Sequence, residues 1–465
     1  MHQADTTPGY DTISLTTNVS VDDYNGAHNP LRLATITDLA GLQIQGNGHS
    51  LIGNPSFINP EGVVYTKTNP QPIRPSDVLT GRAYSFARIS DYVSNVEINN
   101  LVVDGLNSFL SIGKDSIVTV RDSIIRYMGD FGQHPAPLFG AFEDSTLNLQ
   151  RVVISHINNF QKPLSNNQYV WYPTIAGSAA TLNMERSTLD LLASATGGGI
   201  GWSGGTANVV SSVILGQGLS ISDYLLEGVL NVVNSVVRPY NHSATARIQA
   251  YDGGEANVVA STIQYDATFT GDVDRCPADY TCNGAPLQAF NGGTINLSST
   301  VASVINSDLA QIILPYSDDY SNRPGTLNAD AYSFVQPVDQ QNAAALKILF
   351  GQPNLLTSGV PYALTPNIAP YPPIYVSLPT GAYPLTTSPL INVVPDANGT
   401  NQLINPIDGS VISTDVYGNP RTANGRRDIG AVQLTAPVPG PLPLLGIGAA
   451  FGWSRRLRRR LRSCG

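Results

Sequence analysis

The middle of the chain repeats one short pattern. Segments such as SIVTVRDSIIRYM, STLNLQRVVISHI, TANVVSSVILG and VLNVVNSVVRPY alternate apolar and polar residues, and continue after a small or polar break into a second β-branched run. Alternation with a period of two is typical of strands that have one buried face and one exposed face. Each segment therefore predicts two short strands separated by a corner.

The polar residue at the centre of the first strand recurs at intervals of 22 to 39 residues. It is found at Glu97, Thr119, Asn148, Asn183, Asn208, Asn231, Asn257, Asn296 and Asn328. A repeat of this length indicates a solenoid. Most repeats hold no helical pattern long enough to cross between parallel strands. We therefore expect an all-β fold, a right-handed parallel β-helix, followed by an irregular C-terminal region and a short apolar tail.

The asparagines of this row have two interpretations. They could form a ligand-binding stripe, or they could be outward polar positions whose amides hydrogen-bond from coil to coil. We favour the second interpretation, because stacked identical amides satisfy one another without a ligand.

Two other groups of charged residues have similar alternatives. Asp122, Arg151 and Arg186 share one register position and could assist proton abstraction from a sugar acid, but a surface ion pair at a turn is the simpler interpretation. Asp272, Asp274 and Asp279 could hold calcium, but they lack an ordered ligand spacing, so we interpret them as a solvated acidic loop. The six histidines are scattered, and no metal-binding spacing appears among them. Because no constellation of catalytic residues is visible either, we predict no catalytic residue, no metal site and no cofactor.

Charge and cysteine content narrow the possible partners. Six of the 25 basic residues are arginines close to the C-terminus, which leaves 19 basic residues against 34 acidic ones in the rest of the chain. An acidic body disfavours nucleic acid as a partner. Cys276 and Cys282 flank a short loop and could form a disulfide, as in exported proteins, or could remain two unpaired thiols.

Four regions are expected along the chain. Residues 1–337 form the β-helix, 338–373 a short helix and a Pro/Tyr-rich connector, 374–434 a C-terminal region, and 435–465 a tail. The helix is predicted in DQQNAAALKILFG, with Asp339 as its N-cap, Ala343 to Phe350 as its body and Gly351 as its end.

The C-terminal region carries three motifs: SPLINVV (388–394), TDVYGNPR (414–421) and NGRRDIGAVQ (424–433). They resemble the C-terminal region of bacterial choice-of-anchor Q proteins, which are exported parallel β-helix proteins of the pectin-lyase-like superfamily. Gln433 replaces the usual final acidic residue, and Tyr417 stands where Arg is common. The start, ADTTPGYDTISL (4–15), resembles part of the first coil of the same group. We therefore expect the first coil to be truncated and a leader to be missing.

The tail, VPGPLPLLGIGAAFGWSRRLRRRLRSCG, resembles a PEP-CTERM sorting signal. The resembling residues are Val438, Pro439, Gly440 and Pro441, followed by a 12-residue apolar segment that ends at Trp453 and by arginines that begin at Arg455 and Arg456. Gly440 replaces the usual Glu. The resemblance implies transient membrane contact, removal of the tail by a sorting peptidase, and a cell-surface or extracellular destination. The apolar segment is short for a permanent membrane anchor.

Two functions follow from this sequence. The first is an exported, surface-associated β-helix protein with a structural, adhesive or carbohydrate-contacting role and no catalysis, whose partner is an extracellular polysaccharide or a cell-envelope component. The second is a polysaccharide lyase or glycoside hydrolase on the same scaffold. We favour the first, because the repeats place Asn, Ser, Thr and Val at most outward positions, whereas an enzyme needs acidic or basic residues that converge on one groove.

Overall fold

The structure is a computed structural model in which only part of the chain is described. The described residues are 9–20, 31–53, 56–58, 64–66, 78–79, 84–106, 108–129, 137–158, 160–161, 170–171, 173–191, 198–223, 227–239, 248–266, 287–305, 325–330, 332–335, 346–348, 354–355, 394–395, 401–421 and 425–433. The chain divides into one compact unit, Met1–Gln433, and a second unit, Leu434–Gly465, which lies outside the described residues.

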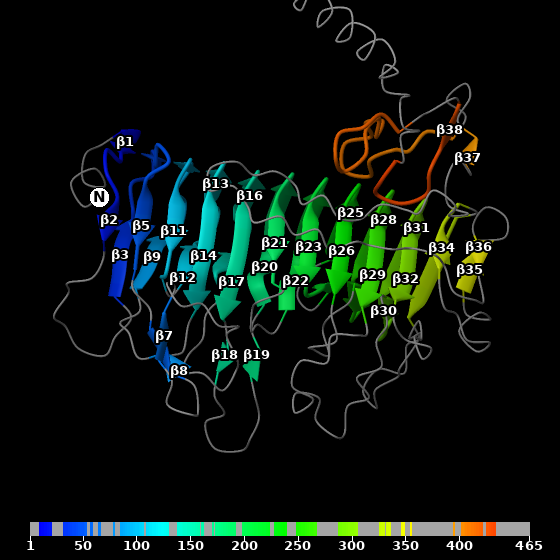
Figure 1. The fold of residues 1–465 in the computed structure, drawn as a ribbon, viewed down its shortest axis with the longest axis horizontal. Coiled ribbons are helices and arrows are strands. Elements are labelled where there is room, and N and C mark those ends of the chain that lie inside the picture. Colours follow the sequence, from blue (N-terminus) through cyan, green and yellow to red (C-terminus); the bar gives the residue numbers. More distant parts are fainter. Residues whose placement is uncertain are drawn as a thin grey trace, which may run out of the picture. The chain divides into compact units, whose positions relative to one another are not determined.

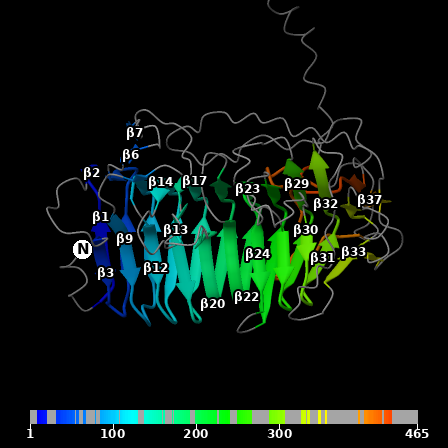
Figure 2. The same ribbon diagram turned by 90° about the horizontal axis from the view of Figure 1, so that it is seen from below.

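Two large sheets contain most of the described strands (Figures 1 and 2). The first sheet comprises β1 (Asp11–Ser14), β3 (Leu31–Ile36), β4 (Leu42–Gln45), β9 (Tyr84–Ile89), β10 (Val96–Asn99), β12 (Ser108–Ile112), β13 (Ile117–Arg121), β15 (Phe139–Phe142), β16 (Thr146–Gln150), β20 (Pro173–Glu185), β22 (Gly198–Val210), β24 (Leu219–Ser222), β25 (Gly228–Val233), β27 (Ile248–Tyr251), β28 (Glu255–Val259), β30 (Leu287–Ala289), β31 (Thr294–Ser298), β33 (Thr326–Ala329) and β35 (Leu346–Ile348). The second sheet comprises β2 (Val19–Ser20), β5 (Ser50–Ile52), β11 (Val102–Asp104), β14 (Ile124–Gly129), β17 (Val153–Asn158), β21 (Thr188–Asp190), β23 (Val213–Gly216), β26 (Val236–Pro239), β29 (Thr262–Asp266), β32 (Val301–Ile305), β34 (Phe334–Val335) and β36 (Asn354–Leu355).

Three small antiparallel groups complete the described strands. They are β6 (Ser56–Ile58) with β7 (Val64–Thr66) and β8 (Val78–Leu79), β18 (Phe160–Gln161) with β19 (Val170–Trp171), and β37 (Val394–Pro395) with β38 (Arg426–Arg427).

Parallel pairing from one coil to the next confirms the predicted β-helix. In the second sheet, for example, β14 pairs in parallel with both β11 and β17. The first sheet contains two such stacks, which merge where the 13-residue strands β20 and β22 run through both. The strands follow one another in sequence order from blue to yellow in Figure 1. Each coil therefore rests on the coil before it, as the repeat in the sequence predicts.

Inward side chains form one continuous apolar core. In β16, Leu147 and Leu149 are fully buried, while the alternate positions face outward, and the same alternation recurs in β10 and β31 of the first sheet. Trp202 of β22 also points inward, and its ring occupies the space beside Gly177, where an added Cβ would lie 2.3 Å from the indole. The Trp202 indole Nε1 donates to the Ala180 carbonyl at 2.9 Å. The core thus tolerates a large ring because the neighbouring coil supplies a glycine.

A row of buried hydroxyls lines the corner between the two sheets. Ser212, Ser235 and Ser261 occupy equivalent positions and are fully buried. The Ser212 backbone N donates to Ser235 Oγ at 3.1 Å, and Ser235 N donates to Ser261 Oγ at 3.1 Å. Ser235 Oγ in turn donates to the Val233 carbonyl at 2.8 Å. The hydroxyls therefore satisfy backbone groups that the corner removes from the sheet ladders.

The C-terminal segment, meaning described residues 394–395, 401–421 and 425–433, packs on the outside of the later coils. Its Val416, Ala431 and Val432 form one apolar cluster with Val213 and Val236 of the second sheet. Further clusters join Val394 and Ile429 to Val301 and Phe334, and Leu403 to Val259 and Ala260. Outward positions of the solenoid are apolar here because this segment covers them.

Two buried arginines fix the C-terminal segment to the corner. Arg421 donates from Nη2 to the Ala260 carbonyl at 3.0 Å and to Asn234 Oδ1, and from Nη1 to the Gly430 carbonyl at 2.8 Å. Arg427 donates from Nη1 to Ser299 Oγ at 3.0 Å. Arg421 is the last residue of TDVYGNPR, so this motif has a structural role in the present chain.

Asp415 of the same motif organises the loop that presents Arg421. Its carboxylate is buried and accepts from the backbone N of Tyr417 at 2.9 Å, of Asn419 at 2.7 Å and of Gln433 at 3.0 Å. Gln433 Oε1 accepts from Asp428 N at 3.0 Å, a role that needs only an acceptor oxygen.

The predicted helix of residues 339–351 is wrong in its described part. Leu346–Ile348 is strand β35, which pairs in parallel with β33. The sequence Leu-Lys-Ile also alternates, and the open edge of β33 offers it backbone partners, so pairing outweighs the helix propensity of the preceding alanines. Strand β36 adds a further pair to the second sheet. The solenoid therefore continues beyond residue 337, where we expected it to end.

Candidate functional site

The asparagine row forms a continuous ladder of side-chain hydrogen bonds. The predicted register is confirmed in each pair from Glu97–Thr119 to Asn296–Asn328. Each Asn Nδ2 donates to the side-chain oxygen of the preceding coil, as in Asn208 to Asn183 at 2.9 Å and Asn231 to Asn208 at 2.8 Å. Asn208 and Asn231 are 7% exposed. Because the amides bond to one another, the row stabilises the stack of coils.

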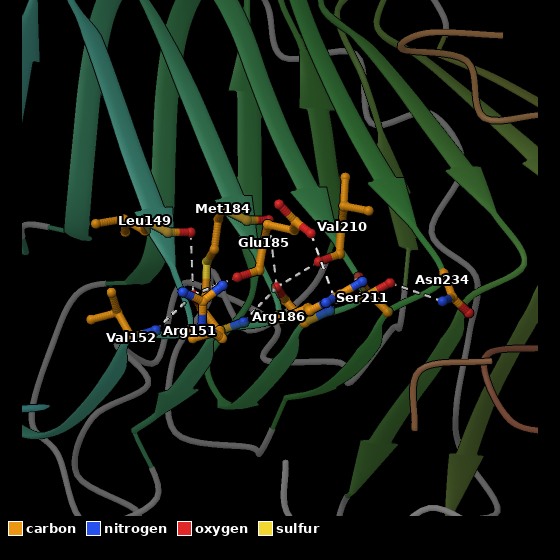
Figure 3. Close-up of polar contacts among 12 residues, drawn as sticks. Leu149, Arg151, Val152, Met184, Glu185, Arg186, Val210, Ser211 and Asn234 are labelled. Atoms are coloured by element: carbon orange, nitrogen blue, oxygen red, sulfur yellow. Dashed lines mark hydrogen bonds and ion pairs between the residues drawn. The ribbon is translucent and has the colours of Figure 1, made fainter. Parts of the chain in front are cut away.

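The predicted charged row lies at the corner that follows the strands of this ladder. Figure 3 shows Arg151 and Arg186 of this row. Asp122, Arg151 and Arg186 have left-handed backbone, with φ of 50°, 54° and 47°. Arg151 Nη2 lies 2.7 Å from Asp122 Oδ2, and this hydrogen bond lowers the pKa of Asp122. The two side chains are 45% and 49% exposed. The structure therefore pairs Arg151 with Asp122 in an ion pair at a turn.

Left-handed residues continue along this corner row into the part that the C-terminal segment covers. They are Ser211, Asn234, Ala260 and Ser299, with φ between 47° and 53°. Asn234 Nδ2 donates to Ser211 Oγ at 2.9 Å. The same corner that exposes Arg151 and Arg186 thus receives Arg421 and Arg427 farther along the solenoid.

A third polar group lies on the outward side of the second sheet, and we name it the Tyr127–His156 cluster. It consists of Asp104, Arg126, Tyr127, Ser155, His156 and Asp190, from strands β11, β14, β17 and β21. Parallel register places Asp104, Arg126, Ser155 and Asp190 in one row, with Tyr127 opposite His156 in the next row. Residues from four coils therefore meet on one surface.

Distances in this cluster show a connected network. Arg126 Nη2 lies 3.2 Å from Asp104 Oδ2, and the guanidinium carbon is 5.8 Å from the centre of the Tyr127 ring. The Tyr127 and His156 rings are 4.6 Å apart at 33°. His156 Nδ1 lies 3.1 Å from Ser155 Oγ. Carboxylate, guanidinium, hydroxyl and aromatic groups thus lie side by side. The side chains of Arg126, Tyr127 and His156 are partly exposed, whereas Asp104, Ser155 and Asp190 are only 5–8% exposed.

Burial lowers the pKa of His156, and Arg126 acts in the same direction, while Asp190 and Asp104 oppose the shift. The imidazole is therefore neutral at pH 7 and retains a nitrogen lone pair. A neutral imidazole can accept a hydrogen bond or a proton from a bound molecule.

No local motif marks this cluster in the sequence, where the six histidines look scattered. The members that pair from coil to coil are separated by 22 to 35 residues in the sequence. Their shared register was the available signal: Asp104, Arg126, Ser155 and Asp190 are each the third residue of the second short strand of their own repeat.

Several predicted residues lie outside the described part of the chain. These are Cys276, Cys282, the three aspartates of that loop, and the sorting residues Val438, Pro439, Gly440, Pro441, Trp453, Arg455 and Arg456. Within the described residues, no group of His, Cys, Asp or Glu is arranged to hold a metal ion. The same part of the chain includes no helix long and apolar enough to cross a membrane.

No protein-family profile matches this chain, and no curated protein is found to be similar to it.

Proposed function

We propose that this chain is an exported, surface-associated β-helix protein that contacts carbohydrate in a structural or adhesive role, without catalysis. The observation that carries the proposal is the Tyr127–His156 cluster on the outside of the solenoid. Sugars present apolar C–H faces together with hydroxyls, and the cluster offers the partly exposed rings of Tyr127 and His156 beside the Arg126 guanidinium, whose side chain is 40% exposed. A stack of coils with internal ladders gives such a surface a rigid support.

The test of this function is glycan binding measured together with turnover. The purified protein is applied to a glycan array, and a panel of acidic and neutral polysaccharides is assayed for new unsaturated ends and new reducing ends. Binding without turnover is the expected result. Absence of binding to every glycan would contradict the proposal.

A polysaccharide lyase or glycoside hydrolase is the second candidate, and the neutral His156 favours it. A neutral imidazole stacked on a tyrosine could act as a general base. Turnover that His156→Gln abolishes while glycan binding persists would establish this candidate over the first.

Export through a removable C-terminal signal is part of the proposal and has its own test. The resemblance of residues 438–456 to a sorting signal supports it, and the sorting peptidase is the expected partner. The intact mass of protein recovered from outside the cell measures the mature C-terminus. A C-terminus beyond Trp453 would show that the tail is retained.

A further inference from the structure

We infer that a second group of side chains, on the outward side of the first sheet, binds a pyranose unit of a glycan. The group consists of Gln249 and Tyr251 of β27, Gln288 of β30, and Phe290 directly after β30, and we name it the aromatic–amide face. The inference rests on the proposed carbohydrate contact and adds a second place for it, in later coils of the first sheet, where β30 is labelled in Figure 2.

Parallel register brings the four side chains of the aromatic–amide face together. The pairing of β27 with β30 places Gln249 opposite Gln288. Tyr251 and Phe290 each follow two positions later, on the same side of the sheet. All four residues are partly exposed, whereas the residues that alternate with them are buried. Strand geometry gives the face a size of about 7 Å along the strands and about 5 Å between coils, which is the scale of one pyranose ring.

The two rings of this face form a stacked pair. The centres of the Tyr251 and Phe290 rings are 5.3 Å apart, and the ring planes differ by 6°. Because both residues are partly exposed, the pair presents aromatic surface to the outside of the solenoid. The C–H face of a sugar packs against surface of this kind.

The fold does not require an aromatic residue at this position. Tyr251 and Phe290 each precede the same tight turn, in which Gly254 N donates to the Tyr251 carbonyl at 3.0 Å and Gly293 N to the Phe290 carbonyl at 2.9 Å. The three coils before Tyr251 have a serine in this register position, namely Ser178, Ser203 and Ser222. A partly exposed aromatic pair where serine is compatible with the sheet indicates a contact with a molecule outside the chain.

The two glutamines supply hydrogen-bonding groups beside the rings. Gln249 Nε2 donates to Gln288 Oε1 at 2.6 Å, and this hydrogen bond holds the two amides side by side. Within the described part of the chain, Gln249 Oε1 and Gln288 Nε2 form no hydrogen bond. The pair therefore keeps an acceptor on one coil and donors on the next for an incoming molecule.

Rings and amides together match the chemistry of a pyranose. A pyranose has apolar C–H groups for the aromatic surface, and its hydroxyls both donate and accept hydrogen bonds. The aromatic–amide face offers ring surface, an acceptor and donors within the area of one such ring. We therefore assign a glycan to this face.

The experiment replaces the rings with the residue that the same row uses in other coils. The variant is Tyr251→Ser/Phe290→Ser. Its matched control is Phe142→Ser, which removes a 45% exposed ring from the same row, four coils before Tyr251 and away from the glutamines. Both are made in a Tyr127→Asn/His156→Asn background, so that the Tyr127–His156 cluster does not contribute, and Asn tolerates the left-handed backbone there.

Titration calorimetry measures binding of gluco-oligosaccharides, manno-oligosaccharides and uronic-acid oligomers of equal length. We expect the background protein to bind at least one of these probes. Tyr251→Ser/Phe290→Ser should bind that probe at least about tenfold more weakly, and Phe142→Ser should leave the affinity unchanged.

Two other outcomes identify which statement fails. A background protein that binds none of the probes, or binding that survives in Tyr251→Ser/Phe290→Ser, overturns this inference, whereas carbohydrate contact stands as long as the wild type binds a glycan on the array. Absence of any glycan binding by the wild type overturns the proposed function itself. Thermal melting checks the fold of each variant. If Tyr251→Ser/Phe290→Ser is unfolded, Gln249→Ser/Gln288→Ser replaces it with the same expected loss, because Ser220 occupies that row one coil earlier.

Discussion

The earlier and later coils share one architecture and differ in what covers their outer surface. In the later coils, Val213, Val236 and Phe334 face the C-terminal segment, and the corner receives the buried Arg421. In the earlier coils, the corner carries the exposed pair Asp122 and Arg151. The same backbone corner is thus an anchoring point in one half and a solvated ion pair in the other.

This difference shows that the backbone conformation at the corner does not depend on which side chains the corner carries. Left-handed backbone recurs from Asp122 to Ser299 whatever the side chain. The two halves differ in whether the outward polar groups at the corner are buried or exposed. Buried polar groups need hydrogen-bond partners in the protein, whereas exposed ones can bond to water. We therefore expect substitutions at equivalent corner positions to have very different effects on stability.

The largest effect is expected for Arg421→Ala. The guanidinium is 1% exposed and donates to Thr414, Gly430, Ala260 and Asn234, so its removal leaves buried acceptors without donors. We expect the free energy of unfolding to fall by about 3–5 kcal/mol, measured by chemical denaturation.

Arg421→Lys tests whether geometry or charge matters at this position. Lysine keeps the charge but lacks the fork that reaches several acceptors, so we expect it to recover less than half of the loss. Arg151→Ala is the matched control in the exposed half of the corner. If Arg421→Ala cost no more than Arg151→Ala, the two halves would not differ as we describe.

The second effect concerns the asparagine ladder, which runs through both halves. In Asn231→Asp the carboxylate cannot donate to Asn208 Oδ1. Two acceptor oxygens, one from the new carboxylate and Asn208 Oδ1, then face each other at a buried position. We expect a loss of roughly 2 kcal/mol at pH 7. Asn148→Asp, in the less buried earlier half, should cost less. Thermal melts of the two variants at pH 7 measure the difference, and equal losses would show that burial does not govern the ladder.

The ladder, unlike the clusters around it, could be predicted from the sequence. Leu-Asn-Leu and Val-Thr-Val alternate with the period of a strand, so Asn148 and Asn183 had to share a face and, at one per coil, a row. Residues without such periodicity were placed incorrectly or missed. Leu346–Ile348 looked helical because local propensity does not include the backbone edge of β33. His156 looked isolated because its partners depend on the register of four coils.

The motifs of the C-terminal segment were recognisable, but their role was not. The sequence contained Arg421 within TDVYGNPR, yet nothing local indicates that its acceptors are Asn234 and Ala260, more than 160 residues earlier. Contacts of such sequence separation depend on tertiary packing and have no periodic signal.

The third prediction concerns the pH dependence of the free energy of unfolding, and it involves His156 in the earlier coils. Burial lowers the folded-state pKa of His156 below its usual value of 6.5, so the unfolded chain binds a proton more readily. The contribution of His156 to stability is complete above pH 6.5 and is lost as pH falls from there toward the folded-state pKa. The free energy of unfolding should therefore decrease more in the wild type than in His156→Asn between pH 7 and about pH 5. Parallel pH profiles of the two proteins would contradict this prediction.

The smallest effect is expected for the exposed pair of Asp122 and Arg151. Both side chains are nearly half exposed, so solvent screens their attraction, and a double-mutant cycle with Asp122→Asn and Arg151→Gln should give a coupling of about 0.5 kcal/mol. The hydrogen bond from Arg151 lowers the pKa of Asp122, so the coupling should be present at neutral pH and disappear as acidification protonates the carboxylate. Salt at about 1 M should also reduce it. A coupling as large as the loss in Arg421→Ala would mean that this corner is stabilised in the same way with or without a covering segment.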